Sequence, residues 1–265
     1  MSINFSNILG IDKVYCISML KNKAKWDDIL KTIKSNGFPN CVIFEAVNGA
    51  EYTSQNLENM VGIWERYILK NNMDRTNHEQ FNKLGALGCY LSHVSIWQDA
   101  KSNGYKNILI FEDDISFQNN FIEEFKKRIE YIPKDYDIFF LDVMKSYKSV
   151  KINKYFNKIE SLFFGTHSYS ITKKAIDIML KTVYPIEVQI DSYMSYAGNL
   201  ANLSLYYTSN LCNQMLHFSD IQTPCIVCDT KYSIFSSMSF VVLLLSAFIV
   251  FIVVVYAISK SNQTV

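Results

Sequence analysis

The sequence predicts an α/β fold, followed near the C-terminus by one membrane-spanning helix. Short apolar runs typical of buried strands alternate with segments of helical periodicity through residues 13–183. The composition, 49% hydrophobic and 14% aromatic, is sufficient for a packed core and excludes a disordered chain. After Met238 the only charged residue is Lys260. A charged domain is therefore expected to precede an apolar segment.

The chain opens with a strand–helix–strand pattern. Residues 13–19 (KVYCISM) and 41–46 (CVIFEA) are apolar runs that predict buried strands. The segment between them predicts a helix, because its large apolar residues recur at positions i, i+3, i+4 and i+7. These residues are Trp26, Ile29, Leu30 and Ile33. Strand–helix–strand is the unit of a parallel sheet.

The same two periodicities predict the later elements. In order, these are a helix at 57–68, a polar loop at 70–83, a helix at 87–97, a strand at 107–111, a helix at 120–131, strands at 136–141, 161–164 and 168–172, and a helix near 173–183. No internal repeat or low-complexity linker separates them, so one domain over residues 1–235 is expected.

Residues 240–258 (FVVLLLSAFIVFIVVVYAI) predict a transmembrane helix. At about 1.5 Å per residue this helix spans about 28 Å, close to a bilayer hydrocarbon core of about 30 Å. The alternative is a buried core helix, although core helices normally keep a polar edge. A juxtamembrane stretch at 236–239 and a short tail at 259–265 complete the expected organisation.

The cellular context follows from what the sequence lacks. No long apolar stretch follows basic residues at the N-terminus, so no secretory signal peptide is expected. A single-pass C-terminal anchor with a cytosolic domain is the simplest topology, and six cysteines without disulfide spacing agree with it. The formal net charge of +1, with arginine only at 66, 75 and 128, argues against a nucleic-acid partner.

Three adjacent carboxylates, Glu112, Asp113 and Asp114, directly follow the strand expected at 107–111. In α/β sheets ligands bind beyond the carboxyl ends of strands, and a cation lowers the repulsion among neighbouring carboxylates. Because alternate residues of an extended segment point to one side, Glu112 and Asp114 are expected to face one ion. Oxygen ligands favour Mg²⁺ or Mn²⁺. The alternative is a charged turn that caps the next helix.

The acidic run belongs to a longer pattern, LGALGCYLSHVSIWQ…NILIFEDDISF, that resembles glycosyltransferase family 25. In that family a Gly-x-x-Leu-Ser-His-x-x-x-Trp helix precedes an apolar strand ending in Glu-Asp-Asp. Further similar segments occur in the same order: VYCIS, FEAVNG at 44–49, GTHSYSITKKA at 165–175, PIEVQID at 185–191 and QMLHFSDI at 214–221. The resemblance covers about residues 13–222.

The resemblance implies a GT-A-type, Rossmann-like nucleotide-binding fold with a mixed sheet. It also implies transfer of a hexose, galactose or glucose, from a UDP-sugar to a hydroxyl acceptor on a glycan, glycolipid or protein, as in lipopolysaccharide biosynthesis. A Mn²⁺ or Mg²⁺ ion held by the acidic run would stabilise the charge on the departing diphosphate.

The resemblance also implies roles for individual residues. Glu112, Asp113 and Asp114 would hold the metal, with His217 as a further ligand or, alternatively, a loop histidine. His93, Ser92 and Asn48 would bind the donor together with Glu112 and Asp113. Asp191 would be the base that deprotonates the acceptor, with Asp142 as the second candidate. The structural alternatives are a core histidine for His93, a helix-packing hydroxyl for Ser92 and a helix N-cap for Asp191.

Two positions depart from the family pattern and motivate other hypotheses. Ser18-Met19-Leu20-Lys21 stands where family members often carry Asp and Arg, and Asn48 replaces the Asp of an Asp-Gly turn. One alternative is therefore a catalytically inactive family member that serves as a membrane-tethered sugar-binding or scaffold module. Another is a metal-dependent phosphohydrolase, which would require two metal ions about 3.5–4 Å apart.

Overall fold

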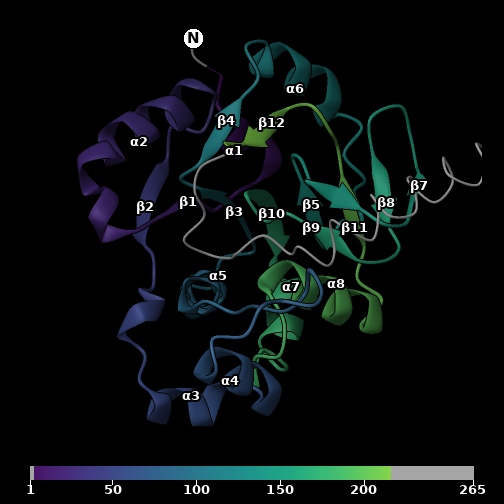
Figure 1. Cartoon of the computed structure of the whole chain (residues 1–265). Coiled ribbons are helices and arrows are strands. Elements are labelled where there is room, and N and C mark those ends of the chain that lie inside the picture. The colour runs from purple at the N-terminus through teal and green to yellow at the C-terminus, as the bar shows by residue number, and fades with distance from the viewer. Residues whose placement is uncertain (1–2, 216–265) are drawn as a thin grey trace, which may run out of the picture. The chain divides into compact units, whose positions relative to one another are not determined.

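The computed structural model describes residues 3–215 (Figure 1). Residues 3–73 and 79–215 belong to one compact unit, and residues 74–78 group with a second unit whose other residues lie outside the described range. The span expected at 240–258 also lies outside that range. Within residues 3–215, no helix is both long enough and apolar enough to cross a membrane.

An eight-stranded mixed sheet forms the centre of the described residues, in the order β2-β1-β3-β10-β5-β11-β8-β7. The strands β1 (Lys13–Ser18), β2 (Cys41–Glu45) and β3 (Asn107–Glu112) are parallel. β10 (Ser168–Thr172) lies antiparallel between β3 and β5 (Ile138–Phe140). The expected α/β fold with a mixed sheet is confirmed.

Shorter strands complete the described architecture. β11 (Leu205–Tyr207), β8 (Asn157–Ile159) and β7 (Ser149–Lys151) extend the large sheet. Two small antiparallel sheets pair β12 (Cys212–Gln214) with β4 (Ile115–Phe117), and β6 (Lys145–Ser146) with β9 (Phe163–Phe164). The β12–β4 pair brings the distant residue Gln214 beside the segment that follows the acidic run.

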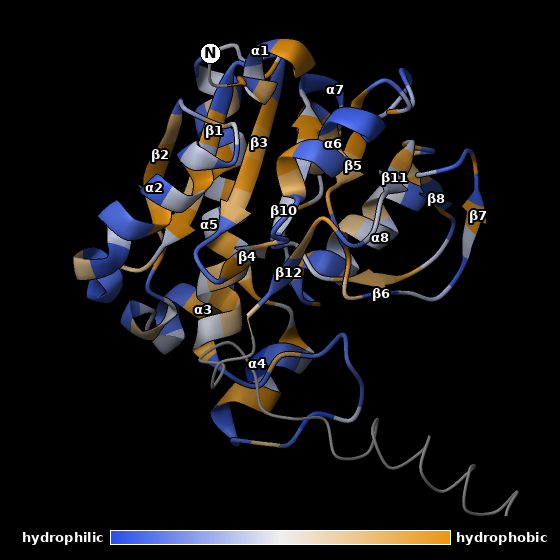
Figure 2. Ribbon diagram, turned by 90° about the horizontal axis from the view of Figure 1, so that it is seen from above, coloured by the Kyte–Doolittle hydropathy of each residue, from blue (hydrophilic) through white to orange (hydrophobic). Residues whose placement is uncertain are grey.

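Helices cover both faces of the sheet (Figures 1 and 2). One face packs against α5 (Leu84–Ser102), α7 (Lys173–Met179) and α8 (Ile190–Leu200). The other packs against α1 (Phe5–Leu9), α2 (Trp26–Ser35) and α6 (Phe121–Ile129). The remaining helical segments are η1 (Leu20–Lys25), η2 (Gly49–Glu51), α3 (Ser54–Met60) and α4 (Ile63–Lys70).

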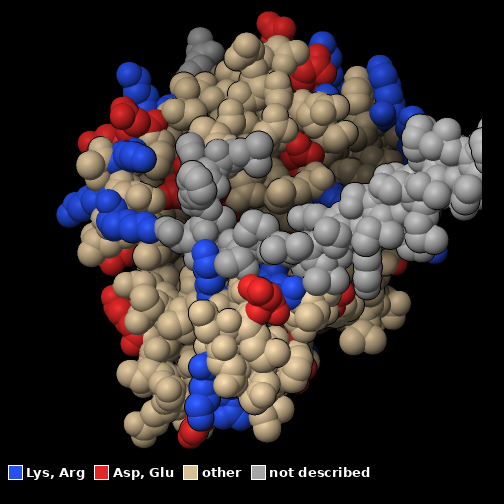
Figure 3. Space-filling model, in the orientation of Figure 1, with Lys and Arg blue, Asp and Glu red and all other residues tan. Residues whose placement is uncertain are grey.

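Strict alternation along β3 assigns its side chains to the two faces. Ile108 and Ile110 pack in the cluster beneath α5, whereas Leu109 and Phe111 pack in the cluster beneath α2 and α6. β3 is buried on both faces, and its apolar colouring in Figure 2 agrees with this. On the face of the molecule shown in Figure 3, acidic and basic side chains are interspersed rather than gathered by sign.

The single helix expected through residues 57–68 is wrong. The structure has two helices, α3 and α4, interrupted at Gly62. The backbone N–H of Gly62 donates to the carbonyl of Ile186 at 2.7 Å, so this turn bonds to a distant segment. A Cβ at residue 62 would lie 2.8 Å from Cγ of Glu187, so a larger residue here would require Glu187 to move.

Candidate functional site

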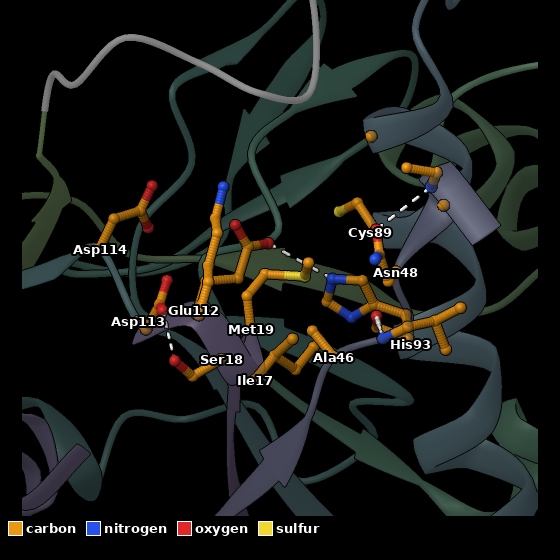
Figure 4. A pocket seen from close by; sticks show the side chains of 16 residues that line it. Ile17, Ser18, Met19, Ala46, Asn48, Cys89, His93, Glu112, Asp113 and Asp114 are labelled. Atoms are coloured by element: carbon orange, nitrogen blue, oxygen red, sulfur yellow. Dashed lines mark hydrogen bonds and ion pairs between the residues drawn. The ribbon is translucent and has the colours of Figure 1, made fainter. Parts of the chain in front are cut away.

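A cavity of about 340 Å³ lies at the carboxyl ends of β1, β2 and β3 (Figure 4). This edge is where open α/β sheets bind their ligands. Its wall comes from these strand ends together with η2 and α5. Its polar and sulfur-containing lining residues are Ser18, Met19, Lys21, Asn48, Cys89, Ser92, His93, Glu112, Asp113 and Asp114.

Glu112 ends β3 and points toward α5, where its carboxylate meets His93 (Figure 4). Its Oε1 accepts a hydrogen bond from Thr166 Oγ1 at 2.8 Å and lies 3.3 Å from Nε2 of His93. Burial raises the pKa of this carboxyl, but the His93 and Thr166 contacts outweigh burial, so the pKa lies below its usual value. Glu112 therefore stays ionised although little of it is exposed.

Asp113 also lines the cavity but has other partners than Glu112. Its Oδ2 accepts hydrogen bonds from Ser18 Oγ at 2.5 Å and from Asn22 Nδ2 at 3.0 Å. Ser18 Oγ in turn accepts from Trp26 Nε1 at 2.9 Å. Asp113 is thus tied to the end of β1 and the beginning of α2.

Asp114 has one satisfied and one unsatisfied oxygen. Gln214 Nε2 donates to Oδ2 at 2.8 Å, whereas Oδ1 is buried and has no hydrogen-bond partner. Burial, together with the nearby charge of Glu112, raises the pKa of Asp114 to about 7. A buried carboxylate oxygen without a partner is suited to binding a cation. A positive charge at that point would offset both the burial of Asp114 and its repulsion by Glu112.

The three carboxylates have different hydrogen-bond partners, and the expectation that Glu112 and Asp114 face one ion stays a prediction. The alternation of β3 stops at Glu112, and the chain turns at residues 113–114 before β4. Within residues 3–215, the His, Cys, Asp and Glu side chains whose ligand atoms all lie within 4.8 Å of one another are Cys89, His93 and Glu112.

His93 connects the core to the cavity. Its side chain is fully buried, as the core-histidine alternative expects, yet its ring also lines the cavity (Figure 4). Nδ1 lies 2.9 Å from the hydroxyl oxygen of Tyr169, which also accepts from Trp97 Nε1 at 3.1 Å. The imidazole is held in place from behind while Nε2 faces Glu112.

Ser92 and Asn48 shape the wall of the cavity. Ser92 Oγ accepts from the backbone N–H of Val47 at 2.9 Å and donates to the carbonyl of Gly88 at 2.7 Å, which is the packing role of the structural alternative. Asn48 Oδ1 accepts from the N–H of Ala50 at 3.2 Å and caps η2. Both side chains line the cavity while their hydrogen bonds fix its backbone.

Asp191 and Asp142 lie outside the lining of this cavity. Asp191 accepts hydrogen bonds from the N–H groups of Ser192 at 2.7 Å and Gly165 at 3.3 Å, and burial raises its pKa to about 6. The N-cap alternative for Asp191 is wrong, because Gln189 is the N-cap of α8. Burial likewise raises the pKa of Asp142 to about 6.

Two further histidines complete the comparison with the expected site. His217 lies outside the described residues. No signal in the sequence pointed to His167. Its side chain is only 1% exposed, and neither ring nitrogen makes a hydrogen bond. Its carbonyl accepts from the N–H of Glu112 at 3.0 Å, so His167 lies directly beside Glu112 where the pairing of β10 with β3 continues. Only the strand pairing reveals the position of His167. The sequence could have indicated that Cys89 lies near His93, because the two residues are one helical turn apart.

The described residues form an α/β protein with a carboxylate-lined cavity at the ends of parallel strands. Its family is shown by the sequence: residues 11–194 match the model of glycosyltransferase family 25 (LPS biosynthesis protein), and the chain belongs to that family.

Curated relatives include enzymes and proteins named as inactive. The chain is 28% identical over 136 residues to the human inactive glycosyltransferase 25 family member 3, covering 50% of this chain and 22% of that protein. It is 27% identical over 126 residues to mouse procollagen galactosyltransferase 2, covering 48% and 19%. It is 30% identical over 175 residues to the procollagen lysyl hydroxylase and glycosyltransferase of Acanthamoeba polyphaga mimivirus, covering 61% and 18%. The chain thus spans about a fifth of the length of these relatives.

Two solved structures with distant likeness to the chain are the following. A UDP-glucose pyrophosphorylase complexed with UDP-glucose has a TM-score of 0.39 at 10% identity, covering 77% of this chain and 92% of that one. The A197 protein from STIV has a TM-score of 0.39 at 12% identity, covering 80% and 93%. TM-scores at this level do not establish a shared fold.

Proposed function

We propose that this protein transfers a hexose, galactose or glucose, from a UDP-sugar to a hydroxyl acceptor on a glycan, glycolipid or protein. The observation that carries the proposal is the orphaned, buried Oδ1 of Asp114 in a cavity at the strand ends of a family 25 chain. A buried carboxylate without a counterion is costly unless a ligand supplies the positive charge.

The cavity walls suit a nucleoside diphosphate bound with a divalent cation. Lys21 lines the cavity, and the first turn of α5 reaches it through Gly85, so a side-chain cation and a helix N-terminus both favour a diphosphate there. Asp114 would hold Mn²⁺ or Mg²⁺ through Oδ1, with Asp113 and Glu112 adding negative charge nearby. When bound, the ion would neutralise charge on the departing diphosphate.

Deprotonation of the acceptor hydroxyl needs a carboxylate whose pKa approaches the working pH. Asp191 and Asp142 both meet that condition, with pKa values raised to about 6 by burial. We favour Asp191, because it matches the late Asp of the family pattern and both burial and the charge of Glu112 raise its pKa. Asp142 remains the second candidate.

The test measures hydrolysis of and transfer from UDP-galactose and UDP-glucose with Mn²⁺ or Mg²⁺. We expect Asp114→Asn to lower turnover by at least about 100-fold, since it removes the negative charge but keeps the shape. Asp177→Asn is the matched control, because Asp177 lies on α7 in an exposed ion pair with Lys101 at 3.1 Å. Equal turnover in Asp114→Asn and wild type would reject the proposal.

The second candidate is a catalytically inactive sugar-binding or scaffold module. Several relatives bear names that call them inactive, and Ser18-Met19-Leu20-Lys21 departs from the family pattern. This candidate predicts that UDP with Mn²⁺ raises the melting temperature while no UDP-sugar is hydrolysed. Detectable hydrolysis that Asp114→Asn abolishes would exclude it.

We also propose that residues 240–258 anchor the protein in a membrane, with the domain on the cytosolic side. The support is the apolar length of that segment. Replacing Leu244, Ile249 and Val253 together with lysine should release the full-length protein into the soluble fraction, because each charge inside a span costs about 2.5–3.5 kcal/mol. Unchanged membrane retention of this variant under alkaline extraction would count against the anchor.

A further inference from the structure

Cys89, His93 and Glu112 form a compact cluster in the wall of the cavity. Their ligand atoms all lie within 4.8 Å of one another, and all three side chains line the cavity. Cys89 and His93 are one turn apart on α5 and therefore project from the same side of the helix. Glu112 reaches them from the end of β3 (Figure 4).

The imidazole of His93 gives a second, independent indication of a ligand. Its Nε2 is buried and makes no hydrogen bond of normal geometry, although it lies 3.3 Å from Oε1 of Glu112. The 3.3 Å between Nε2 and Glu112 Oε1 exceeds the usual 2.7–3.2 Å of an N–H···O bond. In a tetrahedral metal site with bonds of about 2.0–2.1 Å, two ligand atoms lie about 3.3 Å apart, which is the distance seen here.

The surroundings of His93 also suit a metal ligand. Nδ1 lies 2.9 Å from the Tyr169 hydroxyl, so a hydrogen bond on the far side of the ring can fix the orientation and tautomer of the imidazole. When Nδ1 donates to the Tyr169 oxygen, the lone pair of Nε2 faces Glu112 and Cys89. Without a cation, this tautomer would direct the lone pair of Nε2 at the negative carboxylate of Glu112, which is unfavourable. The cation-free protein therefore favours the other tautomer, in which Nε2 carries the proton and directs it toward Glu112.

We propose that Cys89, His93 and Glu112 bind one thiophilic divalent cation of the zinc type, at a site separate from the orphaned oxygen of Asp114. Sulfur, nitrogen and a single oxygen are the ligand set of tetrahedral zinc, whereas Mg²⁺ and Mn²⁺ prefer oxygen ligands. Three protein ligands leave the fourth position open toward the cavity. An ion at this point occupies space that the donor needs, so it inhibits the transferase; this clause rests on the proposed function.

Binding exchanges a proton for the metal. Burial and the charge of Glu112 hold the pKa of the Cys89 thiol well above its usual value, so the cation-free site carries a neutral thiol. The thiol proton is released to solvent as the sulfur–metal bond forms, and Glu112 supplies a second negative charge. The bound pair of anions balances the two positive charges of the ion.

The test is spectroscopic titration with Co²⁺ alone, which reports a sulfur ligand through a thiolate-to-cobalt charge-transfer band. Cys225 and Cys228 lie outside the described residues and are replaced by serine in all proteins compared, so that they cannot supply the band. We expect one equivalent of Co²⁺ to produce the band and Zn²⁺ to displace it. Cys89→Ser should abolish the band, and Cys41→Ser, a buried thiol on β2, should leave it intact.

Glu112→Gln provides a second variant that keeps the side-chain shape. It should weaken Co²⁺ affinity by about 10–100-fold while the band itself remains. Circular dichroism checks that each variant is folded. Absence of the band in the parent protein, or its persistence in Cys89→Ser, would overturn the proposal.

The two proposals fail separately. If UDP-sugars are turned over and Zn²⁺ inhibits the parent protein but not Cys89→Ala, both stand. If no UDP-sugar is turned over while the Cys89-dependent cobalt band forms, the transferase proposal fails and the metal site stands. If turnover depends on Asp114 but no cobalt band forms, only the zinc-type site is rejected.

Discussion

The two faces of the sheet differ in what they bury. The face beneath α1, α2 and α6 packs phenylalanine rings against one another. The ring centroids of Phe5 and Phe125, for example, lie 4.7 Å apart, and their ring planes meet at 69°. The face beneath α5 carries the hydrogen-bonded set of Trp97, Tyr169 and His93, which leads to the cavity. The first face therefore contributes mainly apolar packing to the stability of the fold. On the second face, some buried side chains also hold His93 in position at the cavity.

The first prediction concerns the phenylalanine face. Phe125→Ala should lower the free energy of unfolding by about 3–5 kcal/mol, because it leaves a cavity among fully buried rings. Urea denaturation followed by circular dichroism measures this loss. Co²⁺ binding below the unfolding transition should be unchanged, and Phe125→Leu should lose less stability. A loss under about 1 kcal/mol would contradict tight packing on this face.

The second prediction concerns the contact between η2 and α5 on the other face. Gly49→Ala should cost about 3 kcal/mol, since the added Cβ would lie 1.7 Å from the backbone oxygen of Leu84. Because η2 forms a cavity wall, UDP should no longer raise the melting temperature of this variant.

Gly104→Ala is the control for Gly49→Ala. Its added Cβ meets no atom within 4 Å, but its φ of +69° should cost about 1–2 kcal/mol. This strain lies at the far end of α5, so the melting-temperature increase with UDP should persist. Equal behaviour of the two glycine variants would show that the η2 contact does not shape the cavity.

The third prediction compares one hydroxyl on each face. Tyr169→Phe should cost about 2 kcal/mol, because His93 and Trp97 lose their shared buried partner. It should also weaken Co²⁺ binding about tenfold. Tyr206→Phe removes a hydroxyl that donates to Asp135 at 3.0 Å on the opposite face and should leave Co²⁺ affinity unchanged. Equal Co²⁺ affinities in both variants would refute the orienting role of Tyr169.

The smallest expected effect depends on pH. The folded-state pKa of Asp142 is raised to about 6 by burial, above an unfolded value of about 3.9. Its ionisation therefore destabilises the fold as pH rises from about 4 to 6, and the full cost is present above that range. Asp142→Asn should stabilise the protein by about 1 kcal/mol at pH 8, allowing for partial exposure, and by nothing at pH 3.5. Identical melting-temperature differences at both pH values would contradict this.

Local pattern determined several elements correctly. The spacing of Trp26, Ile29, Leu30 and Ile33 predicted α2, and the apolar run before Glu112 predicted β3. The same pattern failed at residues 57–68, since hydrophobic spacing does not reveal the bond that Gly62 makes to Ile186. Periodicity records which side of an element is buried, but it does not record which distant segment competes for the backbone.

The sequence by itself determined that this is an α/β protein of glycosyltransferase family 25, with carboxylates at the end of a buried strand. Only the tertiary structure decided which partner each carboxylate has. It placed His93 beside Glu112, Ser18 beside Asp113 and Gln214 beside Asp114. These neighbours come from chain segments far apart in sequence, and their convergence depends on strand order and helix packing, which leave no local signature.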